Sequence, residues 1–310
     1  MCGIVMHPFL LPENCIEKIC PTLHPGIPIM DWPDYSLIDC GGQEKLERFG
    51  PYILRRPEPQ AIWAKQAGPA RWDQWDAFYT RSSQEKEGGW KYKGRALEPW
   101  WIRYDQVQVQ LQCTAFGHVG IFPEQRANWQ KLAEILKKLD RPKVLNLFAY
   151  TGVASLVAKQ AGADVVHVDA VPNMISWARR NMEKSGLADI RWVVEDVSRF
   201  VQREVRRGNN YDAVLLDPPA YGRGPAGEKW MLADQLDDLL AACAKLLGPG
   251  GRLILLNMYS MGFSAEIARQ LLELHFPSWK LAANELIIFS ESRLRLPLGI
   301  YGMGENELAS

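Results

Sequence analysis

The sequence predicts an α/β fold in which an open, mostly parallel sheet is flanked by helices and follows a small β-rich subdomain. From about residue 121, short apolar runs alternate with helical patterns at the spacing of strand–helix–strand units. Between residues 35 and 120, short alternating runs rich in aromatic residues are separated by Gly, Pro and charged residues. This second pattern is typical of antiparallel strands.

The chain is expected to divide into three parts. Residues 1–34 are rich in Pro and Cys, lack a period and predict an irregular arm. Residues 35–120 predict the β-rich subdomain, with strands at 52–54, 61–63, 90–92 and 107–111. Residues 121–310 predict a Rossmann-like domain, because right-handed crossovers join its parallel strands.

The Rossmann-like part is justified element by element from its hydrophobic periodicity. Strands are expected over 144–147, 165–168, 190–194, 211–216 and 253–257, and helices over 126–139, 153–161, 174–185, 197–207, 233–247 and 265–275. Two adjacent strands over 284–289 and 294–301 predict a terminal β-hairpin with one antiparallel member.

The composition excludes several classes of protein. Lys plus Arg equals Asp plus Glu at 36 each, whereas a protein that coats nucleic acid nonspecifically is usually basic throughout; a local basic patch stays open. No run of about 18 apolar residues predicts a membrane span. The N-terminus lacks the basic region of a signal peptide. The six cysteines are scattered, as expected of reduced thiols in a cytoplasmic protein.

No His/Cys/Asp cluster has the spacing of a metal site, so no metal is expected. His118 and His167 lie in apolar strand contexts and are expected to be core or cap residues. The aromatic residues of the β-rich part are more typical of a core than of base-stacking platforms, although a stacking role for one or two tryptophans stays open.

Polar segments follow four strands of the predicted parallel sheet, where ligands of such folds bind. The first segment, Asn146–Gly152, leads into a helix whose N-terminal amides favour a carboxylate. The second is Asp169, next to Ala170, whose carboxylate can accept both hydroxyls of a ribose. The third is Asp196 with Val197, suited to an adenine amino group and ring.

The fourth segment is Asp217-Pro218-Pro219-Ala220-Tyr221. Its two prolines remove two backbone donors and stiffen the turn, which leaves carbonyls exposed. Each of the four segments has an ordinary alternative, since a strand-ending Asp is often a helix N-cap and a Gly often marks a turn. Their order over four successive strands is what indicates a shared ligand.

This series resembles the class I S-adenosylmethionine-dependent methyltransferases, and more closely the bacterial 23S rRNA large-subunit methyltransferases that modify cytosine C5 or guanine N7. Those enzymes show N-x-F-x-Y-T-G and D-P-P-x-F turns, and this sequence has NLFAYTG and DPPAY. The resemblance covers about residues 120–260. It implies a Rossmann-like class I methyltransferase sheet and S-adenosylmethionine as the cofactor.

The resemblance also implies a set of cofactor-binding residues. An L-D-Q-R-like element of the family matches Phe122 to Arg126, and it implies that Gln125 and Arg126 lie beside the methionine part of the cofactor. The cofactor-binding residues are then expected to be Phe122, Gln125, Arg126, Asn146, Phe148, Tyr150, Thr151, Gly152, Asp169, Ala170, Asp196, Val197 and Asp217.

Two departures narrow the function. The general class I pattern is a glycine-rich D/E-x-G-x-G-x-G, but here Asn146 replaces the acid and only Gly152 of the glycines remains, a variant shared by the ribosomal RNA group. The cytosine-C5 enzymes also need a nucleophilic cysteine after the fifth strand, where this chain has Ser260. The sequence therefore argues against cytosine-C5 methylation.

A nitrogen acceptor has its own lone pair and needs no covalent intermediate. The hypothesis is that Asp217 and a carbonyl of Pro218 or Pro219 hold an RNA-base nitrogen while Tyr221 stacks on a flipped base; a packed loop aromatic is the alternative for Tyr221. Competing interpretations are a small-molecule or protein methyltransferase, an NAD or nucleotide-sugar enzyme, and a noncatalytic cofactor-binding module. The lack of G-x-G-x-x-G after the first strand argues against the NAD enzyme.

Overall fold

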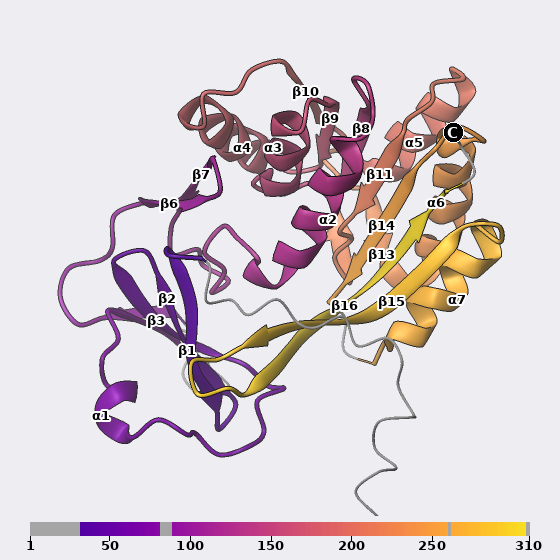
Figure 1. The fold of residues 1–310 in the computed structure, drawn as a ribbon. Helices are drawn as coiled ribbons and strands as arrows, with labels where there is room; N and C mark the ends of the chain where they lie inside the picture. Colours follow the sequence, from indigo (N-terminus) through magenta and orange to yellow (C-terminus); the bar gives the residue numbers. More distant parts are fainter. Residues whose placement is uncertain (1–31, 81–88, 260–261, 308–310) are drawn as a thin grey trace, which may run out of the picture.

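A computed structural model describes residues 32–80, 89–259 and 262–307 of the chain. The expected arm over 1–34 lies outside the described residues except for its last three, and so does Ser260. The structure confirms the α/β class, with a large, mostly parallel sheet preceded by a β-rich region (Figure 1).

The large sheet has seven strands in the order β10-β9-β8-β11-β14-β16-β15. Its bounds are β8 Lys143–Leu147, β9 Asp164–Asp169, β10 Ile190–Val194, β11 Ala213–Leu216, β14 Leu253–Met258, β15 Lys280–Phe289 and β16 Arg295–Glu305. The strands from β10 to β14 are parallel, and β16 runs antiparallel to both of its neighbours. The chain order reverses at β8, which makes the edge beside β8 and β11 the switch point where such sheets bind ligands.

Helices cover both faces of this sheet (Figure 1). Along β8, Val144 belongs to the core under α2 and α3, and Leu145 belongs to the core under α5, α6 and α7. Successive strand residues point to opposite faces, so strands buried on both sides are apolar throughout. The helices are α2 Arg126–Leu136, α3 Val153–Gln160, α4 Pro172–Lys184, α5 Val197–Arg206, α6 Leu232–Leu247 and α7 Ala265–His275.

The N-terminal region forms a second sheet with the order β1-β2-β3-β4-β5. Its elements are β1 Tyr35–Gly41, β2 Glu44–Phe49, β3 Tyr52–Pro57, the short α1 Pro69–Trp72, β4 Ala77–Thr80 and β5 Gly89–Tyr92. A separate antiparallel pair, β6 Trp100–Tyr104 and β7 Val107–Leu111, packs against α4.

The two sheets are joined by packing and by the terminal hairpin. One hydrophobic core runs from Tyr35 and Phe49 in the N-terminal sheet to Leu132 of α2 and Leu296 of β16. The β15–β16 hairpin extends from the large sheet toward β1 (Figure 1), where Leu37 and Ser290 form a bridge. The Ser292 hydroxyl donates to Asp39 Oδ1 at 2.8 Å.

The structure departs from the expected elements in a few places. Residues 61–63 are not a strand: their carbonyls accept from Gly42 and Gln43, but no ladder continues and the Ile62 side chain is exposed. The expected helix over 126–139 ends at Leu136, and the expected strand over 211–216 begins at Ala213. A small hairpin follows the DPP turn, with strands β12 Tyr221–Arg223 and β13 Lys229–Met231.

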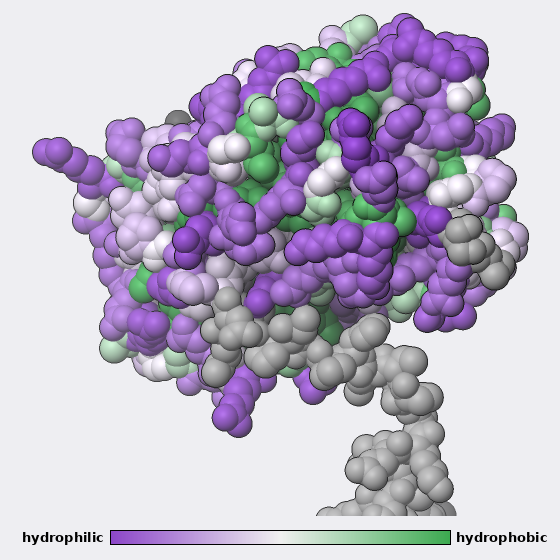
Figure 2. Space-filling view, turned by 45° about the horizontal axis from the view of Figure 1, so that its top comes forward, coloured by the Kyte–Doolittle hydropathy of each residue, from purple (hydrophilic) through white to green (hydrophobic). Residues whose placement is uncertain are grey.

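No helix in the described part of the chain is long and apolar enough to cross a membrane. The face drawn in Figure 2 is mostly hydrophilic, and its hydrophobic side chains show between polar ones rather than as one broad patch.

A buried ion pair ties the N-terminal sheet to the rest of the chain. Glu47 Oε2 accepts from Arg56 Nη2 at 2.5 Å and from Nε at 2.9 Å, and Glu47 Oε1 accepts from the Tyr35 hydroxyl at 3.0 Å. Arg56 also donates to the carbonyl of Gly117 at 3.2 Å. The Arg56 guanidinium keeps the pKa of Glu47 below its usual value despite the burial.

We expect Glu47→Ala to lower the free energy of unfolding by about 3–5 kcal/mol, because it leaves the buried Arg56 cation without its carboxylate. Urea denaturation followed by circular dichroism measures the change. Glu134→Ala is the matched control, since it removes an exposed pair with Lys138 and is expected to change stability little. Equal losses in the two variants would contradict the prediction.

Candidate functional site

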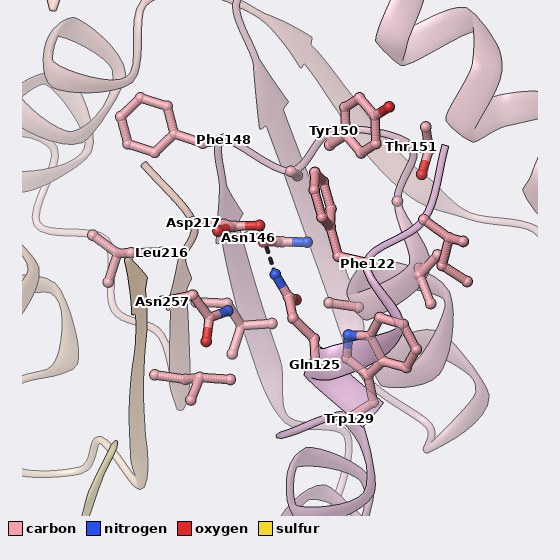
Figure 3. A pocket seen from close by; sticks show the side chains of 17 residues that line it. Phe122, Gln125, Trp129, Asn146, Phe148, Tyr150, Thr151, Leu216, Asp217 and Asn257 are labelled. Carbon is pink, nitrogen blue, oxygen red and sulfur yellow. Dashed lines mark hydrogen bonds between the residues drawn. The ribbon is translucent and has the colours of Figure 1, made fainter. Parts of the chain in front are cut away.

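A pocket opens at the switch point of the large sheet, where β8 and β11 end (Figure 3). Eight of the thirteen residues expected to bind the cofactor line it: Phe122, Gln125, Asn146, Phe148, Tyr150, Thr151, Gly152 and Asp217. Strand ends far apart in the sequence meet there because Leu147 and Leu216 are register partners in adjacent parallel strands.

The loop after β8 has an unusual backbone. Phe148, Tyr150 and Gly152 adopt left-handed conformations, with φ of 54°, 49° and 88°. Glycine adopts such φ values without strain, whereas Phe and Tyr do not. These are three of the positions that the general class I pattern fills with glycine. A Cβ atom on Gly152 would lie 3.0 Å from that of Ala178, so this position also has little room for a side chain.

Asp169 fixes this loop from the end of β9. Its Oδ2 accepts from the amide of Tyr150 at 2.9 Å, and its Oδ1 accepts from the amide of Val171 at 2.8 Å. Burial raises the pKa of Asp169, while the two amides lower it. The carboxylate therefore organises the loop at the edge of the sheet, beside Ala170, although neither residue lines the pocket itself.

Gln125 reaches from the start of α2 toward the end of β11 (Figure 3). Its Nε2 donates to Asp217 Oδ2 at 2.8 Å and to the Tyr259 hydroxyl at 2.8 Å. One buried amide thus joins three segments separated by 92 and 134 residues.

Two carboxyl groups of this network, the half-buried Asp217 and the buried Glu124, have raised pKa values. Burial raises the pKa of Asp217 to about 7, although the hydrogen bond from Gln125 lowers it. Burial also raises the pKa of the neighbouring Glu124 to about 7. Each carboxylate disfavours charge on the other, since Glu124 contributes to the raised pKa of Asp217. Groups that titrate near neutrality in a cleft are candidates for a functional site.

Asp196 and Val197 lie at the end of β10, outside the pocket. Asp196 is the N-cap of α5, and its Oδ1 accepts from the amide of Arg199 at 2.9 Å. The ordinary N-cap interpretation of this residue is therefore correct, although a cap uses only one of the two carboxylate oxygens. Val197 is buried in the core.

Arg126 does not line the pocket that Gln125 lines. It lines a second hollow with Tyr104, and Trp129 borders both spaces. The two residues that the resemblance placed beside the methionine part of the cofactor thus border different hollows.

The DPP turn leads into the small β12–β13 hairpin. The carbonyl of Pro219 accepts from Trp230 Nε1 at 2.7 Å, which holds the turn against the hairpin. Tyr221 is 57% exposed, so it is not the packed loop aromatic considered as its alternative.

Sequence reasoning missed several residues of the site. Tyr259 carried no signal, because its place in the site depends on the long-range hydrogen bond from Gln125. Glu124 lies within the stretch that resembles the family element but was given no role, and the structure places it against Tyr259 and near Asp217. Asn146 donates to Ser155 Oγ at 2.9 Å, and Ser155 contacts His167 Nδ1 at 3.0 Å. His167 is a core residue as expected, with a pKa that burial lowers to about 3.

Of the two expectations for His118, a core or a cap residue, the structure rules out the core. It is exposed, and its ring lies 5.5 Å from that of Phe122 in an edge-on arrangement.

An open sheet of this topology, with a pocket at its switch point and Asp169 and Asp217 after the strands on either side of β8, is the arrangement in which Rossmann-like folds bind nucleoside cofactors. A family model described as S-adenosylmethionine-dependent methyltransferase matches residues 61–284, and the chain belongs to that family. The predicted cofactor, S-adenosylmethionine, is thereby confirmed.

Curated relatives include ribosomal RNA methyltransferases. Ribosomal RNA large subunit methyltransferase K/L of Shewanella amazonensis is 30% identical over 194 residues, which are 59% of this chain and 26% of that protein. Ribosomal RNA large subunit methyltransferase I of Aeromonas hydrophila is 33% identical over 152 residues, which are 44% of this chain and 35% of that protein. The chain therefore spans about a quarter to a third of the length of these relatives.

Solved structures match over more of the chain. The SAM-dependent methyltransferase from Agrobacterium tumefaciens is 40% identical with a TM-score of 0.84, and the match covers 88% of this chain and 91% of that one. A protein crystallised with SAH has a TM-score of 0.68 at 18% identity, over 87% of this chain and 75% of that one. At that identity, the second likeness shows the fold alone.

The raised pKa of Asp217 makes stability depend on pH. The folded protein holds a proton there up to pH of about 7, whereas the unfolded chain releases it near the ordinary value of 3.8, so folding loses free energy as the pH rises between these values. We expect Asp217→Asn to raise the free energy of unfolding at pH 8 by on the order of a few kcal/mol, and the gain to shrink toward pH 4.

Urea denaturation at pH 4.5, 6 and 8, chosen to bracket the roughly neutral pKa, measures this effect. Asp238→Asn, on the exposed face of α6, is the control and is expected to show no such gain. A loss of stability at pH 8, or a gain that does not change with pH, would show that the Asp217 carboxyl is not held protonated by burial.

Proposed function

We propose that this protein transfers a methyl group from S-adenosylmethionine to a nitrogen of an RNA base, in an rRNA-like substrate. The observation that carries the proposal is the half-buried Asp217 carboxyl at the end of β11, which lines the switch-point pocket at the DPP turn. The names of the curated relatives support RNA as the substrate class. Among the residues that the structure describes, none of those lining the pocket is a cysteine, which favours a nitrogen acceptor over cytosine C5.

The residues around the pocket fit the cofactor. The strained loop from Asn146 to Gly152 brings backbone close to the pocket, and we assign the methionine part to this loop with Phe122 and Gln125. Asp169 and Ala170 are assigned to the ribose, and Asp196 and Val197 to the adenine. Because Arg126 lines another hollow, Gln125 is the better candidate for the contact that the resemblance gave to both.

When bound, the cofactor supplies an already activated methyl group, so the protein mainly positions and desolvates the acceptor. Asp217 is placed to accept a hydrogen bond from an amino or ring nitrogen of the base. The Pro218 carbonyl is the better second acceptor, because that of Pro219 already binds Trp230. Tyr221, exposed at the end of the turn, is assigned to stacking on the flipped base.

We expect Asp217→Ala to bind S-adenosylmethionine within a few-fold of the wild-type affinity but to lose about 100-fold or more in methyl transfer, as for other lost positioned groups. Calorimetry measures the binding, and tritium transfer from labelled cofactor measures the reaction. Asp238→Ala, on an exposed helix face, is the control. Undiminished transfer by Asp217→Ala with retained binding would eliminate the catalytic role.

We expect Asp169→Asn to weaken S-adenosylmethionine binding about 10- to 100-fold. The substitution removes the charged acceptor assigned to the two ribose hydroxyls. It also disturbs the hydrogen bonds that residue 169 accepts from the amides of Tyr150 and Val171. Calorimetric titration measures the change. Asp196→Asn keeps the N-cap of α5 and is expected to show a smaller loss. Wild-type affinity in Asp169→Asn would remove this residue from the cofactor site.

The substrate class is tested with extract from cells that lack the protein. We expect label from tritiated cofactor to enter the RNA fraction, in a cytoplasmic reaction. Label that enters protein or small metabolites instead would support the alternative methyltransferase functions on the same fold.

A further inference from the structure

A second hollow lies beside the cofactor pocket, between the N-terminal sheet and the start of α2. It shares Ile121 and Phe122 with the pocket, so the two spaces adjoin. Its other lining residues include Lys45, Arg56, Tyr79, Phe116, Glu124 and Tyr259. The hollow therefore borders both the proposed methyl-transfer site and the β-rich region, which has no assigned role in that reaction.

The turn over residues 114–118 forms one wall of this hollow and is firmly braced. Its backbone is closed by the bond from the Gly117 amide to the Thr114 carbonyl at 3.0 Å. The Tyr79 hydroxyl donates to the Ala115 carbonyl at 2.9 Å, and Trp90 Nε1 donates to the Thr114 carbonyl at 2.7 Å. The buried Arg56 holds the Gly117 carbonyl at 3.2 Å. Three side chains of the N-terminal sheet thus hold the backbone of the turn by hydrogen bonds.

This rigid turn presents the ring of Phe116 to solvent, with 81% of the residue exposed. A ring held at a fixed place in water can stack on a base without any rearrangement of the protein.

Aromatic rings continue from the turn to the cofactor pocket. His118 lies 5.5 Å from Phe122, and Phe122 lies 5.5 Å from Tyr150 and 5.4 Å from Tyr259, measured between ring centres. Stacked bases are held by such surfaces with little regard to sequence.

The charges of the hollow also fit an uncharged aromatic occupant. The Lys45 ammonium lies 3.2 Å from Glu58, and Arg56 is paired with the buried Glu47. Because both cations are balanced within the protein, the hollow favours a neutral ring over a phosphate group.

We propose that this hollow is a subsite for an RNA base that neighbours the base to be methylated, and that Phe116 is the platform on which this neighbouring base stacks. The inference rests on the proposed function, because it requires RNA as the substrate. It gives the N-terminal sheet a role, which is to hold the platform at a fixed place beside the methyl-transfer site.

The experiment compares Phe116→Ala, Phe116→Trp and wild-type protein. Large-subunit ribosomal RNA from cells lacking the protein is the acceptor, and tritium transfer is measured against RNA concentration. We expect Phe116→Ala to raise the KM for RNA about 5- to 100-fold, the range given by the loss of one stacked base. The affinity for S-adenosylmethionine and the thermal unfolding temperature should stay at wild-type values, and Phe116→Trp should restore the KM.

Ile62→Ala is the matched control, because Ile62 is 79% exposed, also lies in the N-terminal region and does not line the hollow. If the wild-type protein labels RNA and Phe116→Ala has the wild-type KM, the platform is wrong and the proposed function stands. The platform is also wrong if Ile62→Ala raises the KM as much as Phe116→Ala. If the wild-type protein does not label the RNA, and in the extract labels only protein or metabolites, both proposals fail together.

Discussion

The hydrogen bonds of the Gln125 amide are the constraint on which the site depends. Its Nε2 joins Asp217 at the end of β11 to Tyr259 after β14, and its backbone begins α2. Burial alone favours a protonated Asp217, and this amide is the group that partly offsets it. Glu124 immediately precedes Gln125. Its carboxyl contacts the same Tyr259 hydroxyl and borders the adjoining hollow.

The N-terminal sheet is part of this arrangement rather than an attachment to it. It shares a continuous hydrophobic core with α2, α3 and β16. Arg56, held by its ion pair with Glu47, also binds the Gly117 carbonyl and so fixes that turn. The terminal hairpin closes the connection from the other side through the contact of Ser292 with Asp39. The position of the DPP turn relative to the turn at 114–118 is therefore set by packing that spans the whole described chain.

Periodicity was enough to predict the parallel strands, because strands buried on both faces are apolar runs such as 144–147 and the helices between them carry one apolar face. Periodicity failed at 61–63, an apolar run that forms a loop hydrogen-bonded to the turn at Gly42. It also missed the strands β1, β2, β4 and β6. Asp169 and Asp217 could be predicted as site residues because each follows a strand of the parallel sheet, where ligands of such folds bind. Tyr259 could not be predicted, since only the three-dimensional contact with Gln125 distinguishes it from an ordinary loop residue. The role of Glu124 could not be predicted either, because it depends on the contact with Tyr259.

The loss of glycines after β8 also has a structural reason. A left-handed conformation costs a residue with a side chain about 1–2 kcal/mol relative to glycine, so Phe148 and Tyr150 need compensating contacts. The Phe148 ring lies 4.8 Å from that of Trp230, and Tyr150 packs on Phe122. Trp230 in turn holds the Pro219 carbonyl. Phe148, which stands where the general pattern has glycine, thus connects the loop after β8 to the DPP turn through Trp230. The same side chains that strain the loop therefore fix its position relative to the DPP turn on the other side of the pocket.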